Sequence, residues 1–130
     1  NNYIIVDFGT ATTFDVVIKK NYLGGIIAPG VTLSLNTLSS KASLIPPIEL
    51  KSVDKILGNN TVRAVRSGFY WGYIGLVESI INKIIKQTNK KYKIIFTGGL
   101  SYLFKKGMNC KVFIDQDITI KGLLKTIKLI

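Results

Sequence analysis

Residues 6–15 are Val6-Asp7-Phe8-Gly9-Thr10-Ala11-Thr12-Thr13-Phe14-Asp15, and they lie between an apolar run, Tyr3–Val6, and an alternating run, Thr12–Ile18. This pattern predicts a β-hairpin whose tip carries an Asp, a Gly and several Thr residues. Gly9 lets the backbone approach a ligand closely, and the N–H groups of a tight turn can bind an anion. The Thr hydroxyls add donors, and Asp7 offers oxygen to a hard cation. The tip therefore predicts a site for phosphate and a cation, hence for a nucleotide.

Outward from this hairpin, the sequence predicts a third strand and then alternating helices and strands. The expected elements are strands at 3–7, 11–19 and about 22–28, helices at about 31–40 and 61–88, a strand at 93–96, a helix at about 100–106, a strand at 111–114 and a helix at about 118–129. The longest helix is indicated by apolar residues that recur at spacings of three and four. A meander followed by alternating units favours an α/β domain with a mixed sheet and helices on its faces.

Composition excludes several classes of protein. The chain has 130 residues, 47% of them hydrophobic, which suits one domain with one core and argues against disorder. No apolar run reaches about 18 residues, and no basic segment precedes the first apolar run, so we expect neither a membrane span nor a signal peptide. A single cysteine, Cys110, and no histidine make an internal disulfide impossible and a zinc site improbable. We therefore expect a cytoplasmic protein.

The net charge of +11 raises the question of nucleic acid. The densest Lys cluster, within residues 83–93, falls at the end of the long predicted helix, where the helix dipole favours cations. Aromatic residues are not interleaved with these lysines, which speaks against a nucleic-acid site. A basic surface also attracts anionic substrates such as ATP. We expect no nucleic-acid partner.

Further segments allow both a structural and a functional interpretation. Gly24–Gly30 suits a bulge and a turn, or close approach to a ligand. Gly58-Asn59-Asn60-Thr61 suits a helix cap, or contact with an anionic or hydroxylated ligand. Thr97-Gly98-Gly99 follows a strand, at the sheet edge where open α/β sheets usually bind ligands.

Two features within regular elements also need an explanation. Gly68, Gly72 and Gly75 fall on roughly one side of the long helix, which suits a subunit interface or close internal packing. Asp15 lies within a strand, where Asp is disfavoured, so we expect it to hydrogen-bond locally or to organise the site.

These segments, taken in order with Asp117-Ile118-Thr119-Ile120-Lys121-Gly122-Leu123, resemble the type III pantothenate kinases. That family belongs to the acetate kinase, sugar kinase, Hsp70 and actin superfamily, so the resemblance implies an actin-like ATPase (ribonuclease H-like) fold. It also implies ATP-dependent phosphorylation of pantothenate, the first step of coenzyme A biosynthesis. The implied cofactors are a monovalent cation, potassium or ammonium, and magnesium with ATP.

The resemblance also implies roles for particular residues. Asp7 would ligate the monovalent cation, and Gly9 and Thr10 would contact ATP phosphate. Thr61 would contact pantothenate across the interface of a homodimer that forms through helix 61–88. Gly98 and Gly99 would lie near the nucleotide.

The sequence departs from the family pattern in two places. Asn59 replaces a basic residue that the family usually has in its Gly-X-Asn-Thr turn. The family's N-terminal domain, with an Asp-X-Gly-Asn-Thr phosphate loop, and its Gly-X-Asp-Arg motif, which supplies the catalytic base, are both absent from the chain. We therefore expect residues 1–130 to be a C-terminal actin-like ATPase domain that is inactive alone. The alternative is a non-catalytic relative with a regulatory or binding role.

Overall fold

The structure is a computed structural model that describes residues 1–129, and its elements follow the expected order. They are β1 (Asn2–Phe8), β2 (Ala11–Ile18), β3 (Asn21–Pro29), α1 (Val31–Lys41), α2 (Thr61–Thr88), β4 (Lys93–Gly98), α3 (Ser101–Lys105), β5 (Val112–Ile114) and α4 (Ile118–Leu129). The bounds of α2 and α4 are those predicted. Strand β4 extends beyond its predicted end at Phe96, because Thr97 and Gly98 continue the pairing with β1.

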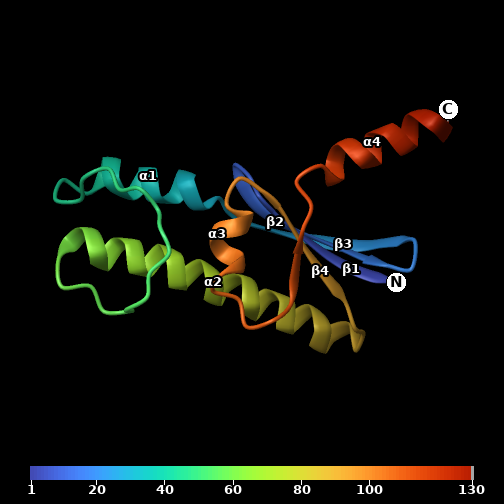
Figure 1. Cartoon of the computed structure of the whole chain (residues 1–130), viewed down its shortest axis with the longest axis horizontal. Helices are drawn as coiled ribbons and strands as arrows, with labels where there is room; N and C mark the ends of the chain where they lie inside the picture. The colour runs from blue at the N-terminus through green and yellow to red at the C-terminus, as the bar shows by residue number, and fades with distance from the viewer. Residues whose placement is uncertain (130) are drawn as a thin grey trace.

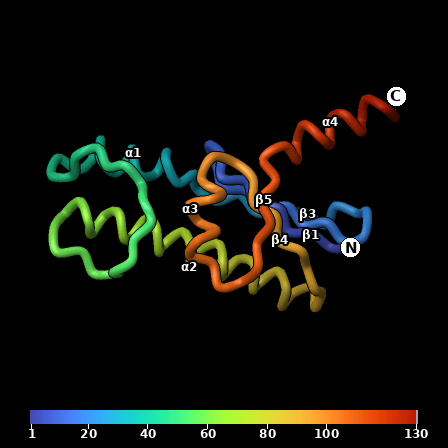
Figure 2. Tube along the Cα trace, in the orientation of Figure 1, coloured from blue at the N-terminus to red at the C-terminus, as the bar shows by residue number. Residues whose placement is uncertain are grey.

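The strands form one mixed sheet in the order β3-β2-β1-β4-β5. Figure 1 labels β1 to β4, and Figure 2 also labels β5. Strand β1 is central: it pairs antiparallel with β2 and parallel with β4, so that Val6 lies between Phe14 and Phe96. The parallel pair β4–β5 completes the sheet. Parallel strands need a crossover, and α2 supplies the one between the meander and β4. The mixed α/β sheet that the sequence predicts is confirmed.

The hydrophobic core lies on one face of the sheet, beneath α2 and α3. Alternate residues of the strands point into it, as the two-residue period of a strand requires. On α2 the inward residues recur every three or four positions, and they are Tyr70, Ile74, Val77, Ile81 and Ile84. Phe8 packs edge-on against Phe96, with ring centroids 4.9 Å apart, and stacks on Phe104 of α3 at 5.1 Å. The α2–sheet contact therefore holds the domain together.

The opposite face of the sheet has no comparable cover. Figures 1 and 2 show α4 extending away from α2 and beyond the sheet, and no residue of α4 is buried. The helix nevertheless has apolar side chains at Ile120, Leu123, Leu124 and Ile127, each more than half exposed. Within residues 1–129, no helix combines the length and the apolar character that a membrane crossing requires.

Candidate functional site

A row of oxygen-bearing side chains crosses the uncovered face at the carboxyl end of the parallel strands. Asp7 of β1 lies opposite Thr13 of β2 and opposite Thr97 of β4. Side chains paired in this way point to the same face, about 5 Å apart across the strands. Asp7, Asp15 and Thr97 line one hollow together with Thr119 at the start of α4. We call Thr13, Asp7 and Thr97 the oxygen row.

The hairpin tip follows the oxygen row directly. The Gly9 N–H donates to the Ala11 carbonyl at 3.1 Å, which closes a tight turn, and Gly9 and Thr10 are exposed. A methyl group added at Gly9 would lie 3.6 Å from both Asp7 Oδ1 and the Ala11 carbonyl oxygen. That distance is an ordinary contact, so neither packing nor a positive φ requires glycine here. The space beside Gly9 faces two oxygens and is open to a ligand.

The glycine pair Gly98-Gly99 lies beside this tip, because Gly98 pairs with Phe8. Gly98 has φ = +94°, and a side chain on it would meet the Phe8 carbonyl oxygen at 2.6 Å. Backbone geometry thus requires glycine at position 98 whether or not a ligand binds. Gly99 differs: it is exposed, and a methyl group there would touch nothing within 4 Å. The structure therefore brings Asp7, the hairpin tip and the glycine pair to one edge of the sheet.

The start of α1 is a third element at this edge. A side chain on Gly30 would collide with the Thr10 carbonyl oxygen at 1.8 Å, so the helix begins against the hairpin tip. Among the described residues, no side chain caps the start of this helix. The Thr12 hydroxyl donates to the Pro29 carbonyl at 3.0 Å and is fully buried. Thr12 thus ties the hairpin to α1, and the suggestion that its hydroxyl serves a ligand is wrong.

Asp15 hydrogen-bonds locally, as the sequence suggests. Its carboxylate accepts a hydrogen bond from the Tyr22 hydroxyl at 3.1 Å. This bond, more than partial desolvation or the Asp15 charge, raises the pKa of Tyr22 above its ordinary value of 10.0. The Tyr22 hydroxyl thus gives the Asp15 carboxylate a hydrogen-bond partner, which offsets the cost of placing an Asp within a strand. Asp15 lies one rung behind Asp7, opposite Ile5, so it borders the oxygen row without belonging to it.

Thr61 lies apart from these groups, at the first residue of α2. The middle of α2 reaches the sheet edge, where the Tyr73 hydroxyl donates to the Pro29 carbonyl at 3.2 Å. Thr61 precedes Tyr73 by about 18 Å along the helix, at a rise of about 1.5 Å per residue. Figure 1 shows this end of α2 on the same side of the molecule as the carboxyl end of α1, away from the sheet. One copy of the chain does not bring Thr61 to the hairpin tip.

The surroundings of Thr61 are basic. The Asn60 side chain caps α2 by accepting from the Arg63 N–H at 2.9 Å, so Asn60, not Thr61, is the capping residue. Beside it is a hollow of about 360 Å³ that Lys55, Arg63 and Arg66 line. Cations next to the amino end of a long helix favour an anionic ligand. The predictions from sequence did not include these basic residues. Arg63 and Arg66 are neighbours on α2, and the loop that precedes α2 brings Lys55 to them.

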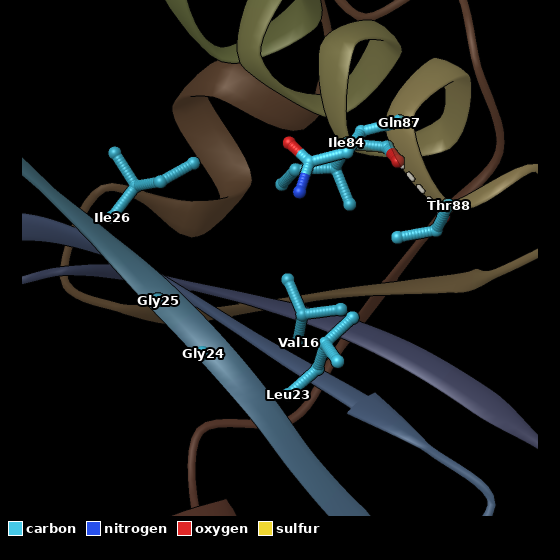
Figure 3. A pocket seen from close by; sticks show the side chains of 8 residues that line it. All are labelled: Val16, Leu23, Gly24, Gly25, Ile26, Ile84, Gln87 and Thr88. Carbon is cyan, nitrogen blue, oxygen red and sulfur yellow. Dashed lines mark hydrogen bonds between the residues drawn. The ribbon is translucent and has the colours of Figure 1, made fainter.

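The glycines in β3 have a structural explanation. The β2–β3 register shifts between Val16 and Val17, opposite Gly24, whose φ is +147°. This is a β-bulge, in which glycine is favoured. The hollow next to it, drawn in Figure 3, faces the end of α2 at Gln87 and Thr88 and is lined by no charged residue. Of the two interpretations of Gly24-Gly25, the bulge is the one that the structure supports.

The glycines of α2 do not pack internally. Side chains added at Gly68, Gly72 or Gly75 would meet nothing within 4 Å. Gly68 and Gly72 line an apolar groove together with Leu38 of α1 and with Val65, Phe69, Tyr73 and Leu76 of α2. Internal packing is therefore not the reason for these glycines, and the groove faces outward.

Carboxylates do not cluster near the oxygen row in the way that a divalent-metal cage requires. Within residues 1–129 there is no group of three or more His, Cys, Asp or Glu side chains close enough to hold a metal ion. Asp7 instead has threonine neighbours and the Ala11 carbonyl within reach of the same space. Carboxylate, hydroxyl and carbonyl oxygens are the ligands that hard cations prefer. The oxygens around Asp7 are thus of the kind that bind a hard cation.

Comparison with known sequences gives a consistent result. The family model described as type III pantothenate kinase matches residues 1–83. The type III pantothenate kinase of Pelagibacter ubique is 58% identical over 130 residues, which are 100% of this chain and 52% of that protein. The type III pantothenate kinase of Cereibacter sphaeroides is 48% identical over 124 residues, 95% of this chain and 48% of that protein. The chain thus spans about half the length of the curated relatives it matches.

Comparison with solved structures concerns the fold. A putative Baf family transcriptional activator from Campylobacter jejuni matches with a TM-score of 0.70 and 24% identity, over 98% of this chain and 57% of that one. The ethanolamine utilization protein EutJ from Carboxydothermus hydrogenoformans matches with a TM-score of 0.53 and 20% identity, over 88% of this chain and 43% of that one. These are actin-like ATPase-fold proteins, and the predicted fold class is confirmed.

Proposed function

The chain belongs to the type III pantothenate kinase family, and we propose that the protein carrying it phosphorylates pantothenate with ATP to give 4′-phosphopantothenate. This reaction is the first step of coenzyme A biosynthesis. The observation that carries the proposal is the convergence of Asp7, the Gly9-Thr10 tip and Gly98-Gly99 at one sheet edge. The carboxyl ends of parallel strands are where open α/β sheets bind their ligands.

In this proposal the nucleotide lies along the hairpin tip. The backbone of Gly9 and the hydroxyl of Thr10 contact ATP phosphate, and Gly98 and Gly99 lie next to the nucleotide. The absence of a packing reason for glycine at positions 9 and 99 supports this assignment. The uncapped start of α1 beside Thr10 adds backbone donors and a positive helix end, both of which favour phosphate. Magnesium accompanies ATP as its counter-ion.

Asp7 is the proposed ligand of a monovalent cation, potassium or ammonium. Thr13, Thr97 and the Ala11 carbonyl complete the oxygen-rich surroundings. Such a cation, when bound, supplies positive charge close to the phosphates. Asp7 is the charged member of the oxygen row, and its negative charge attracts the cation.

Thr61 is the proposed contact to pantothenate, and its distance from the tip favours a contribution to the site of a second subunit. The outward groove along Gly68 and Gly72 is the proposed surface for that homodimer. We expect Gly72→Glu to dissociate the dimer in sedimentation analysis. Gly75→Glu, a matched change outside the groove, should leave the dimer intact.

Thr61→Ala tests the pantothenate contact. It should raise the KM for pantothenate more than the KM for ATP, and an effect confined to ATP would contradict the proposed role of Thr61.

The reaction forms a bond between the pantothenate hydroxyl oxygen and the γ-phosphorus, and it breaks the bond from that phosphorus to the β–γ bridging oxygen. The hydroxyl loses its proton and ADP leaves. Phosphoryl transfer of this kind depends on positioning and on charge stabilisation from both sides of a cleft. The family's Gly-X-Asp-Arg motif, with its catalytic base, does not occur in residues 1–130. We therefore expect this chain alone to be inactive.

The decisive experiment is ATP-dependent phosphorylation of pantothenate by the intact protein that carries this chain, with and without potassium. Potassium-stimulated turnover supports both the activity and the cation site. A folded protein that binds nucleotide without turnover would instead support the non-catalytic alternative.

A further inference from the structure

On the side of β4 that faces β5, the backbone of Gly98 bonds to a side chain and not to a strand. The last pair between β4 and β5 joins Phe96 to Ile114, so at Gly98 the edge of β4 has passed the end of β5. Gln116 occupies this place. Its Oε1 accepts from the Gly98 N–H at 3.0 Å, and its Nε2 donates to the Gly98 carbonyl at 2.9 Å. The Gln116 amide thus extends the sheet by one rung beyond the last residue of β5.

Gly98 is held from its other sides as well. Its carbonyl accepts a second hydrogen bond, from the Ser101 hydroxyl at 2.8 Å, so both backbone polar atoms of Gly98 have partners. On the opposite side Gly98 pairs with Phe8 of β1 in the register of the sheet. Gly99, the next residue, is exposed, and within residues 1–129 a methyl group added to it would touch nothing within 4 Å. The hydrogen bonds that fix the backbone of Gly98 therefore also fix the position of Gly99, the next residue.

The backbone that carries Gln116 is itself fixed. The Asp115 N–H donates to the Phe96 carbonyl at 3.0 Å, and the Asp115 carboxylate bonds the Lys121 ammonium at 2.9 Å. The Asp117 N–H donates to that same carboxylate at 3.1 Å. Gln116 therefore presents its amide from an anchored turn, although its side chain is exposed to solvent. An anchored residue with two backbone bonds is suited to fixing a neighbouring loop.

We propose that Gln116 is a positioning residue for the nucleotide: its amide holds the Gly98-Gly99 turn in the geometry that ATP meets. The proposal rests on the proposed function, since it concerns the same nucleotide site. Gln116 touches the turn and not the reacting atoms. Without it the Gly98 N–H loses its protein partner, the turn gains freedom, and nucleotide binding must then order it. The pantothenate contact at Thr61, on another element, is unaffected.

The test compares the same substitution at the two glutamines of the chain. Gln116→Met keeps the length of the side chain and removes both hydrogen bonds. Gln87→Met is the control, because Gln87 is exposed, lies across the hollow of Figure 3 from β3, and its side chain makes no hydrogen bond within residues 1–129. Both variants are made in the intact protein. The measurements are the KM for ATP, the KM for pantothenate, the Kd for ATP by calorimetry, and the hydrogen-exchange rate of the Gly98 amide.

We expect Gln116→Met to raise the KM and Kd for ATP about fivefold or more and to speed exchange at Gly98, with the KM for pantothenate within about twofold of its original value. Gln87→Met should change none of these. Faster exchange at Gly98 with an unchanged ATP affinity would overturn the positioning role and leave the proposed function standing. A parent protein that binds ATP without turnover would refute the proposed kinase activity, and the Kd comparison would still decide the role of Gln116. A parent that binds no ATP overturns both.

Discussion

The two faces of the sheet are built from alternate residues of the same strands, yet they differ in almost every property. On the covered face, Phe14 and Val6 are fully buried beneath α2. On the uncovered face, one residue along, Asp15 and Asp7 are partly exposed, and Asp15 accepts a hydrogen bond from Tyr22. Because successive side chains of a strand point to opposite faces, residues that stabilise the core alternate with residues of the candidate site. Substitutions at adjacent positions should therefore have effects of different kinds.

The largest expected effect is on the covered face. Phe14→Ala removes a fully buried ring and leaves a cavity, so we expect the free energy of unfolding to fall by about 3–5 kcal/mol. Urea unfolding of the intact protein measures this. Thr13→Ser, one residue away on the uncovered face, should cost less than about 1 kcal/mol. Equal losses at the two positions would show that the faces are not separated in this way.

Gly98 and Gly99 allow stability and ligand binding to be compared at two adjacent residues of one turn. Gly98→Ala places a methyl group 2.6 Å from the Phe8 carbonyl oxygen at φ = +94°, so we expect it to destabilise the fold by about 2 kcal/mol or more. Gly99→Ala has free space and should leave stability unchanged while it weakens ATP binding. Thermal unfolding and ATP calorimetry on both variants distinguish these effects. A Gly99→Ala variant with full ATP affinity would remove Gly99 from the nucleotide site.

Asp7→Asn tests the chemistry of the uncovered face without disturbing the core. Asparagine keeps the shape and loses the charge, so we expect turnover in saturating potassium to fall to the level measured without potassium. The free energy of unfolding should change by less than about 1 kcal/mol, because Asp7 is partly exposed. Initial rates across a potassium titration provide the measurement. An unchanged potassium response would rule out Asp7 as the ligand.

The smallest expected effect is at Asp15 and Tyr22. The hydrogen bond raises the pKa of Tyr22 above 10.0, so its contribution to stability is fully present below about pH 10 and is lost as the pH rises through the raised value. Asp15→Asn should bring the pKa of Tyr22 down toward 10, which an ultraviolet absorbance titration detects. The same titration curve before and after the substitution would mean that the bond does not persist in solution.

Local sequence pattern predicts the elements because their causes are local. The bounds of α2 follow from the cap at Asn60 and the Asn89 that ends the helix in a left-handed conformation. The strand order follows from the meander and from the parallel crossover. Asp7 and Gly9 could be recognised because the residues around them form one continuous motif. Their proposed roles stay predictions, since placement alone tests none of them.

Other features of the site have no local signal. Gln116 meets Gly98 across 18 positions in sequence, and nothing around Gln116 suggests this contact. The burial of Thr12 depends on Pro29, which only the β2–β3 pairing brings near. The separation of Thr61 from the hairpin tip is set by the length of α2. Such features depend on tertiary geometry, which periodicity does not encode.

The central place of β1 has a consequence for the order in which the chain folds. Its partner β2 follows after a two-residue turn, but its partner β4 begins about ninety residues later, where Tyr3 pairs with Lys93. Ribosomes add roughly 5–20 residues per second, so the meander emerges several seconds before β4. During that interval one long edge of β1 is unpaired, and until α2 has been synthesised the apolar residues of β1 also lack its cover. Because unpaired strand edges and exposed apolar surface are what chaperones protect, we expect a pause in translation before β4 to lengthen the dependence of the nascent chain on chaperones.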